Sequence, residues 1–162
     1  MELLDLVDEN DKVIGVTDKP AAHQKRLPHR VVAVYVFNDQ GELYVQVHKA
    51  SGGLLDNSIG GHVIKGEAYD AAAVREAREE LGIDQTLTHL ANFYSNEGRY
   101  LHMFALYECQ AAKDWKFMPN NEVEQIVAMK LSAIRKMMKD NPEKFTGGFI
   151  NTMKQYVALK GL

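Results

Sequence analysis

The sequence predicts an α/β fold, in which a mixed β-sheet carries helices packed on its faces. Three observations support this prediction. Short segments with strand character dominate the first half of the chain, one helical segment interrupts them, and two further helical segments follow near the end. No shift in composition and no linker-like stretch divides the 162 residues. We therefore expect a single domain spanning residues 1–162.

Turn-forming residues divide the first half of the chain into short strands. Valine-rich and alternating apolar segments are typical of strands that are buried on both faces or on one face. The predicted strands are residues 3–7, 12–16, 30–38 and 43–48. The sequence Asp8-Glu9-Asn10-Asp11 predicts a hairpin turn between the first two strands. Residues 50–56, which include two adjacent glycines, predict an open loop.

Helical segments interrupt and follow the strands. Residues 69–81 contain three consecutive alanines and are followed by Gly82, which predicts a helix with a glycine stop. A helix over residues 131–139 should end at the Asn141-Pro142 pair. A last helix over residues 149–159 has apolar side chains at helical spacing. The later predicted strands are residues 87–94, 100–109 and 123–129.

The composition excludes several classes of protein. Hydrophobic residues make up 46% of the chain and charged residues 25%, and 19 basic against 22 acidic residues give a net charge of −3. Without a basic excess we expect no nucleic-acid partner and no anionic membrane partner. Cys109 is the single cysteine, so no disulfide can form within the chain. The longest apolar run, residues 31–37, is far shorter than the roughly 20 residues of a membrane span. With no basic and apolar leader sequence, we expect a cytoplasmic location.

Three carboxylates share one face of the predicted helix over residues 69–81. At 3.6 residues per turn, Glu76, Glu79 and Glu80 lie within about 100° of arc. A separate apolar stripe is formed by Val74, Ala77 and Leu81. The acidic residues repel one another at spacings of three and four residues, and a hard cation such as Mg²⁺ would compensate this repulsion. The alternative interpretation is a solvated face that is balanced by arginines 75 and 78.

Glycines precede this helix and allow a tight backbone path near a ligand. Gly61 and Gly66 have the first spacing of a phosphate-binding P-loop. However, Glu67-Ala68 stands where that motif requires Lys and then Ser or Thr, so the P-loop interpretation fails. A carboxylate at this place favours a phosphate site built around a metal ion.

The pattern from Gly61 to Ile83 resembles the signature of the Nudix superfamily at every fixed position. The matching residues are Gly61, Glu67, Arg75, Glu76, Ala77, Glu79, Glu80, Gly82 and Ile83. Most members of this superfamily hydrolyse a nucleoside diphosphate linked to another group, with Mg²⁺ or Mn²⁺ as cofactor. The resemblance implies an α/β/α sandwich with a mixed sheet, which agrees with the fold class predicted above.

The resemblance also implies roles for individual residues. Glu76 and Glu80 would ligate the metal, with Glu79 beside them and the backbone carbonyl of Gly60 as a further ligand. The remaining residues of the signature would be structural, with Glu67 and Arg75 paired to hold the loop against the helix; these residues are Gly61, Glu67, Arg75 and Gly82.

A further carboxylate from a later loop is expected in many members, with Glu97 and Glu122 as candidates here. Glu79, Glu97 and Glu122 are therefore the candidates for the general base. Glu76 is a further candidate catalytic residue, in its role as a metal ligand. Arg99, His29 and His48 are candidate substrate contacts, because each could bind a phosphate.

Residues 3–130 resemble the branch of the superfamily that includes isopentenyl-diphosphate isomerase. In those isomerases, histidines near His23, His29 and His62 help to hold a second metal. Whether they do so here, or whether His23 and His29 form a hydrogen-bonded pair that ties the N-terminal segment to the sheet, is open at this point. His89 and His102 are interpreted as ordinary strand residues.

Two differences argue against an isomerase. Gly60 stands where the isomerase has its catalytic cysteine, and glycine cannot transfer a proton. The only tryptophan, Trp115, comes too early to be the one that faces the carbocation. The sequence thus favours a hydrolase that cleaves a diphosphate linkage in a small molecule. An isomerase and a nucleotide-binding module without catalysis are the alternatives. Substrate and oligomeric state, a homodimer included, stay open.

Overall fold

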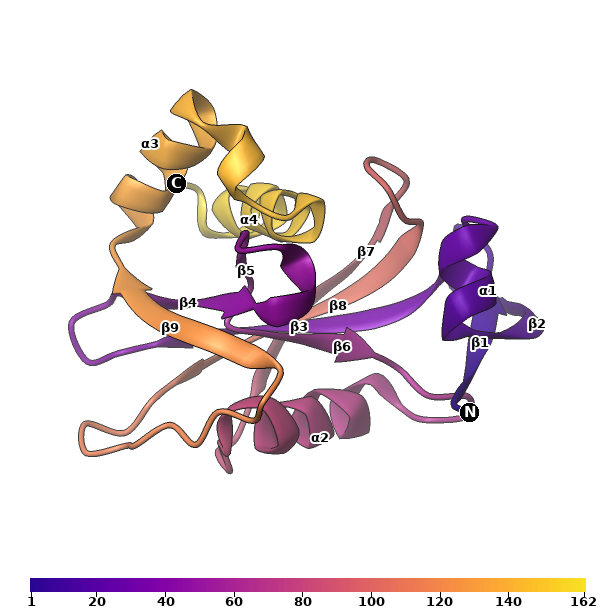
Figure 1. Cartoon of the computed structure of the whole chain (residues 1–162), viewed down its shortest axis with the longest axis horizontal. Helices are drawn as coiled ribbons and strands as arrows, with labels where there is room; N and C mark the ends of the chain where they lie inside the picture. Colours follow the sequence, from indigo (N-terminus) through magenta and orange to yellow (C-terminus); the bar gives the residue numbers. More distant parts are fainter.

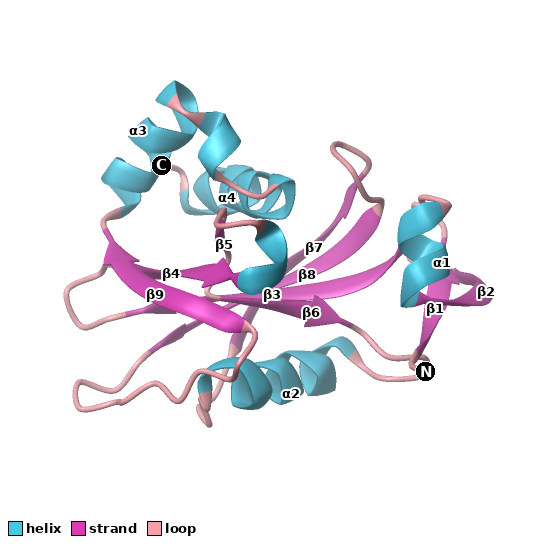
Figure 2. Ribbon diagram, viewed as in Figure 1, coloured by secondary structure: helices cyan, strands magenta, loops and turns pink.

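The computed structural model describes all 162 residues, and its central feature is a nine-stranded sheet with helices on both faces (Figures 1 and 2). The strands are β1 (Leu3–Val7), β2 (Val13–Asp18), β3 (His29–Phe37), β4 (Leu43–His48), β5 (Leu55–Asp56), β6 (Ile59–His62), β7 (Thr88–Ser95), β8 (His102–Gln110) and β9 (Val123–Met129). The helices are α1 (Lys19–Gln24), α2 (Tyr69–Leu81), α3 (Leu131–Asp140) and α4 (Gly147–Lys160), with 3₁₀ turns at Lys49–Ser51 and Pro142–Lys144.

Strand β3 organises the sheet, because it pairs with four other strands. It runs parallel to β8 over its whole length and antiparallel to β1, β4 and β6. The remaining strand pairs are antiparallel. The sheet is therefore mixed, as the sequence predicts.

Alternate residues of β3 supply the two halves of the core. Val32, Val34 and Val36 pack into a cluster with the buried face of α2. Val31, Ala33 and Tyr35 pack into a second cluster, which includes Phe149 and Met153 of α4 and Ile134 of α3. Because successive side chains of a strand point to opposite faces, a valine-rich strand of this kind suits the middle of an α/β/α sandwich. Figure 1 shows α2 on one face of the sheet and α3 and α4 on the other.

Helix α2 has the bounds that the sequence predicts, residues 69–81. It ends at Gly82, which has a φ of 67° and donates its backbone N–H to the carbonyl of Arg78. This left-handed conformation is strained for residues other than glycine, so Gly82 fixes the end of the helix. The buried residues of α2 include the alanines that face the sheet and, among charged residues, Glu80.

The structure contains three elements that the sequence analysis does not predict, namely α1, β5 and β6. Helix α1 is only six residues long, begins after the capping side chain of Asp18 and has Pro20 in its first turn. Strand β6 contains two adjacent glycines, so it lacks the side-chain pattern of a strand, and only its pairing with β3 defines it. Strand β5 occupies the end of the segment predicted as an open loop.

Candidate active site

Helix α2 and strand β6 approach each other closely at Gly61. A Cβ atom at this position would lie 2.1 Å from the carboxyl carbon of Glu76, so the Glu76 side chain could not keep its present position. Gly61 is therefore needed because it leaves the space that the Glu76 side chain occupies. The same close approach places the acidic face of α2 against the strand that carries Gly60.

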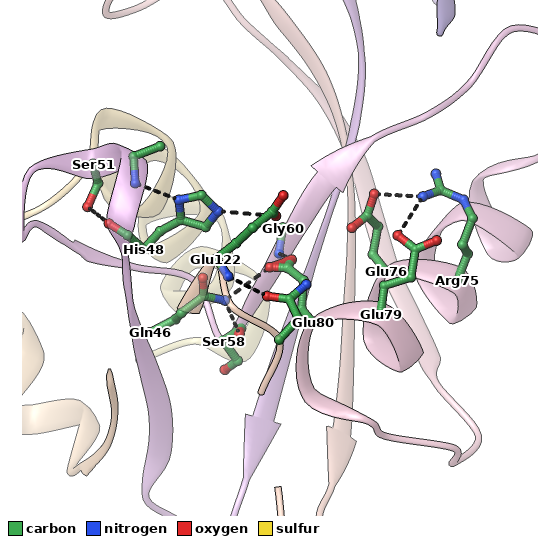
Figure 3. Close-up of polar contacts among 12 residues, drawn as sticks. Gln46, His48, Ser51, Ser58, Gly60, Arg75, Glu76, Glu79, Glu80 and Glu122 are labelled. Atoms are coloured by element: carbon green, nitrogen blue, oxygen red, sulfur yellow. Dashed lines mark hydrogen bonds and ion pairs between the residues drawn. The ribbon is translucent and has the colours of Figure 1, made fainter. Parts of the chain in front are cut away.

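Arg75 braces the loop before α2 against the helix. Its Nε and Nη2 donate to the two carboxylate oxygens of Glu67, each at 2.9 Å, and Nη2 also donates to the carbonyl of His62 at 2.9 Å. Its Nη1 donates to Glu76 at 2.8 Å and to Glu79 at 3.3 Å (Figure 3). These hydrogen bonds from Arg75 lower the pKa of the Glu67 carboxyl. The predicted pair of Glu67 and Arg75 is present, and Arg75 also holds two of the candidate metal ligands.

Glu80 is the most buried carboxylate of the acidic face, with 3% of its surface exposed. Its Oε1 accepts the backbone N–H of Gly60 at 2.9 Å, and its Oε2 accepts Nε2 of Gln46 at 3.1 Å. No cationic side chain contacts it. Burial raises the pKa of Glu80 to about 8, against the two hydrogen bonds, which lower it.

Glu76 and Glu79 differ in burial although both contact Arg75. The side chain of Glu76 is 13% exposed and that of Glu79 is 57% exposed. Burial raises the pKa of Glu76 to about 7, while the Arg75 charge and hydrogen bond oppose this rise. A buried carboxylate that lacks a full counter-charge favours a nearby cation. Carboxylate oxygens are ligands that Mg²⁺ and Mn²⁺ prefer, so the donor chemistry of Glu76 and Glu80 fits the cofactor that the sequence implies.

The segment before β9 lies next to this acidic face. The backbone N–H of Asn120 donates to the carbonyl of Glu80 at 3.0 Å, and the N–H of Lys49 donates to the carbonyl of Glu122 at 2.9 Å. The Glu122 carboxylate lies 3.7 Å from Nε2 of His48. His48 accepts the N–H of Ala50 at its Nδ1, so a neutral imidazole carries its proton on Nε2, which faces Glu122 (Figure 3).

Glu97, the other candidate for a catalytic carboxylate, lies elsewhere. It belongs to the turn between β7 and β8, and it is 3.5 Å from Nζ of Lys154 on α4. Helix α4 covers the face of the sheet opposite to α2 (Figure 1). Arg99, in the same turn, is exposed and lies over the ring of Tyr100. Glu122 thus belongs to the segment beside the acidic face of α2, whereas Glu97 lies near α4.

A family model for the NUDIX domain matches residues 27–148. The chain belongs to the Nudix family. The matched range includes α2, β6 and the segment that carries Glu122, so it contains the whole acidic site.

Relatives of this Nudix chain divide between two activities. It is 42% identical over 96 residues to isopentenyl-diphosphate Delta-isomerase 2 of Photorhabdus laumondii, a match that covers 57% of this chain and 54% of the relative. The chain thus spans about half the length of that relative. It is 36% identical over 129 residues to a Nudix hydrolase of Deinococcus radiodurans, covering 74% of each. The crystal structure of DR0079 from Deinococcus radiodurans superimposes with a TM-score of 0.79 at 29% identity, covering 95% of this chain and 98% of that one. No helix of the Nudix chain is long and apolar enough to cross a membrane.

Four histidines meet at the other end of β6, next to α1. They are His23 of α1, His29 of β3, His62 of β6 and His102 of β8. His29, expected as a substrate contact, is instead fully buried in this cluster, where a substrate cannot reach it. His102 lies at the start of strand β8, as expected, and its ring also packs against His29 with the ring centroids 4.7 Å apart.

Burial keeps these histidines neutral. It lowers the pKa of His62 to about 2, of His102 to about 3 and of His23 to about 4, and neighbouring positive charges act in the same direction. The pKa of His29 is lowered as well, mainly by burial.

Sequence reasoning missed Gln46 and His102. Gln46 occupies a strand position in the predicted alternation, and nothing in the sequence shows that its amide would reach across to Glu80. No local pattern singles out His102, since only the folded structure shows that four of the six histidines converge.

Proposed function

We propose that this chain is a metal-dependent hydrolase that cleaves a diphosphate linkage in a nucleoside-diphosphate-type or related small molecule. The observation that carries the proposal is the acidic face of α2, where Glu76 and Glu80 are buried and held in place beside Gly60 and Gly61. Glu76, Glu80 and the carbonyl of Gly60 would hold Mg²⁺ or Mn²⁺, with Glu79 at the exposed edge of the site.

The residues around the carboxylates fix their positions before a substrate arrives. The Gly60 N–H and the Gln46 amide hold Glu80, and Arg75 holds Glu76. Fixed ligands of this kind avoid the free-energy cost of reorganisation during the reaction. When bound, the divalent cation would supply electrostatic stabilisation of the negative charge that develops on the diphosphate oxygens.

Glu122 is the general base in this proposal. A water molecule adds to phosphorus, the bridging P–O bond breaks, and Glu122 accepts the proton that the water loses. His48 would orient the carboxylate through its Nε2–H, which the Ala50 N–H keeps on that nitrogen. Glu79 is the alternative base, since its exposed carboxylate is bound only by Arg75.

Isomerase activity is the second candidate, because a relative that is 42% identical carries that name. Against it, Gly60 stands at the place of the catalytic cysteine of the isomerases. A Cβ at Gly60 would have only the carbonyl of Val32 within 4 Å, at 3.8 Å, so the backbone would accept a cysteine here but the chain does not have one. A nucleotide-binding module without catalysis is the third candidate.

The decisive experiment is a substrate screen with Mg²⁺ or Mn²⁺. Nucleoside diphosphates, dinucleotide polyphosphates, sugar nucleotides, coenzyme A and isopentenyl diphosphate are incubated with the protein, and the products are identified by liquid chromatography and mass spectrometry. We expect cleavage of at least one diphosphate linkage, and a loss of at least about 100-fold in Glu80→Gln. Glu124→Gln, an exposed carboxylate on β9, is the matched control and should retain full activity. Isomerisation without hydrolysis would refute the proposal, as would binding without turnover.

A further inference from the structure

The helical layer formed by α3 and α4 carries a charge opposite to that of the rest of the chain. Residues 130–162 contain seven Lys and Arg residues against two Asp and Glu residues, which gives a net charge of +5. Residues 1–129 contain 12 basic against 20 acidic residues, which gives a net charge of −8. Figure 1 shows α3 and α4 on the face of the sheet opposite to α2. The positive charge of the molecule is therefore concentrated away from the acidic face of α2.

A groove of about 270 Å³ lies between α3 and α4. The apolar side chains that line it are half-buried or buried, whereas the basic ones are exposed. The lining residues are Arg135, Met138 and Lys139 of α3 and Ile150, Met153, Lys154 and Val157 of α4. On each helix they recur at spacings of three, four or seven residues, so they share one side of the helix. The groove thus has an apolar floor and a basic rim.

The basic side chains of the rim are little compensated by acidic residues of the chain itself. Neither Arg135 nor Lys139 forms an ion pair. Lys154 has one acidic neighbour, Glu97 at 3.5 Å, and both side chains are exposed, so this pair contributes little to stability. By contrast, Lys136 of α3, which does not line the groove, pairs with Asp140 at 2.7 Å. The charges of the rim are therefore available to an anionic partner.

The shape and chemistry of the groove select among anionic partners. A bilayer is entered by apolar side chains that protrude, whereas those of the groove lie on its floor, below the exposed basic groups. Single-stranded nucleic acid stacks on aromatic side chains, and none of the seven lining residues is aromatic. A two-fold contact with a second copy would bring the same basic rim against itself. The volume is also below the roughly 300–1,000 Å³ of pockets that enclose small molecules. A segment of another protein fits best.

We propose that the groove between α3 and α4 binds an acidic amphipathic helix of a partner protein. Such a helix can lay an apolar stripe into the groove between two other helices. Acidic residues on both sides of the stripe then face Arg135, Lys139 and Lys154, while the flexible side chains of Met138 and Met153 adapt to the apolar stripe. The net charge of −8 on residues 1–129 repels an acidic helix from the rest of the chain, so the attraction is confined to this layer.

The test uses the full-length protein and a fluorescein-labelled synthetic helix of about 20 residues, with leucines along one stripe and glutamates on both flanks. We expect this peptide to bind in fluorescence anisotropy at low salt. Its dissociation constant should rise at least about tenfold in Lys139→Glu, and the same peptide with glutamine in place of glutamate should bind at least about tenfold more weakly to the wild type. Lys136→Glu is the matched control. It makes the same charge change on the same helix outside the groove, and it should raise the dissociation constant by less than about threefold.

Met138→Gln tests the floor of the groove separately from its rim. Glutamine keeps the length and the helix propensity of methionine, so we expect this variant to remain folded by circular dichroism and to bind the peptide at least about fivefold more weakly. The proposal is overturned if the glutamate peptide does not bind, if the glutamine peptide binds equally well, or if Lys136→Glu weakens binding as much as Lys139→Glu does. It is also overturned if phosphatidylserine vesicles displace the bound peptide, because the groove would then be a lipid site. None of these measurements depends on the hydrolase activity.

Discussion

Replacing Glu80 with glutamine should make the metal-free protein more stable at alkaline pH and should remove much of the pH dependence of its stability. Glu80 has 3% of its surface exposed and no cationic partner, and burial raises its pKa from 4.5 to about 8. The folded protein therefore keeps a proton on Glu80 over a pH range in which the unfolded chain has lost it. Because the pKa of Glu80 is higher in the folded protein, its bound proton stabilises the folded state. This stabilisation is fully present below pH 4.5 and is lost as the pH rises towards 8.

The magnitude follows from the pKa values. Each tenfold difference in proton affinity corresponds to about 1.4 kcal/mol, so between pH 5 and pH 9 the wild type loses about 4 kcal/mol through Glu80. A glutamine has no such dependence. It costs about 1 kcal/mol at every pH, because its N–H groups face the donors of Gly60 or Gln46. At pH 9 the variant should thus be more stable than the wild type by about 3 kcal/mol.

The assay is urea denaturation followed by circular dichroism, with excess EDTA, at several pH values from 5 to 9. The quantity that matters is the difference in unfolding free energy between variant and wild type, because the contributions of the buried histidines cancel in it. Glu79→Gln is the matched control. It removes the same charge one residue earlier, from a side chain that is 57% exposed. The unfolding free energy of Glu79→Gln should therefore stay within about 1 kcal/mol of the wild-type value at every pH. If the difference in unfolding free energy between Glu80→Gln and the wild type stays constant from pH 5 to pH 9, Glu80 is already ionised in the metal-free protein. That result would refute the reasoning.

Three further predictions concern activity. Glu122→Gln should lower kcat by about 100-fold or more, while Glu97→Gln should have little effect, because only Glu122 lies beside the acidic face. Equal losses of kcat in steady-state assays of the two variants would contradict this assignment. Hydrolysis should be abolished by EDTA, and its rate should increase from pH 6 to about pH 8–9. The reason is that Glu76 and Glu80, with pKa values raised to about 7 and about 8, must lose their protons before a cation binds. A rate of hydrolysis that falls over this pH range would argue against this role of the two carboxylates. With isopentenyl diphosphate and Mg²⁺, neither the wild type nor Gly60→Cys should form dimethylallyl diphosphate, and detection of that product by mass spectrometry would restore the isomerase interpretation.

The sequence predicts most of the fold because its strongest elements carry local signals. The valine-rich strand β3 and the alanine-rich helix α2 are evident from side-chain patterns, and Gly82 marks the end of α2. Helix α1 and strand β6 lack such signals. A six-residue helix has too few residues for periodicity, and a strand with two glycines has too few side chains for alternation.

The candidate site is predicted less completely, because long-range pairing decides which side chains meet. Spacing along one helix is enough to place Glu76, Glu79 and Glu80 on one face. Spacing cannot show that Glu80 is buried and Glu79 exposed, since this depends on how α2 rests on β6. Nor can it choose between Glu97 and Glu122, whose positions are set by different turns of the sheet.

Strand β6 illustrates why these contacts are invisible in a sequence. Gly60 contributes a backbone N–H to Glu80, Gly61 contributes the absence of a side chain beside Glu76, and the carbonyl of His62 accepts Arg75. Only the ring of His62 is a side-chain contribution, and it belongs to the histidine cluster. One four-residue strand thus supports both the acidic face of α2 and the four histidines. Three of its four contacts are made by backbone atoms or by the absence of a side chain, so both sites depend on the register of β6 on β3 as well as on Gly61 and His62.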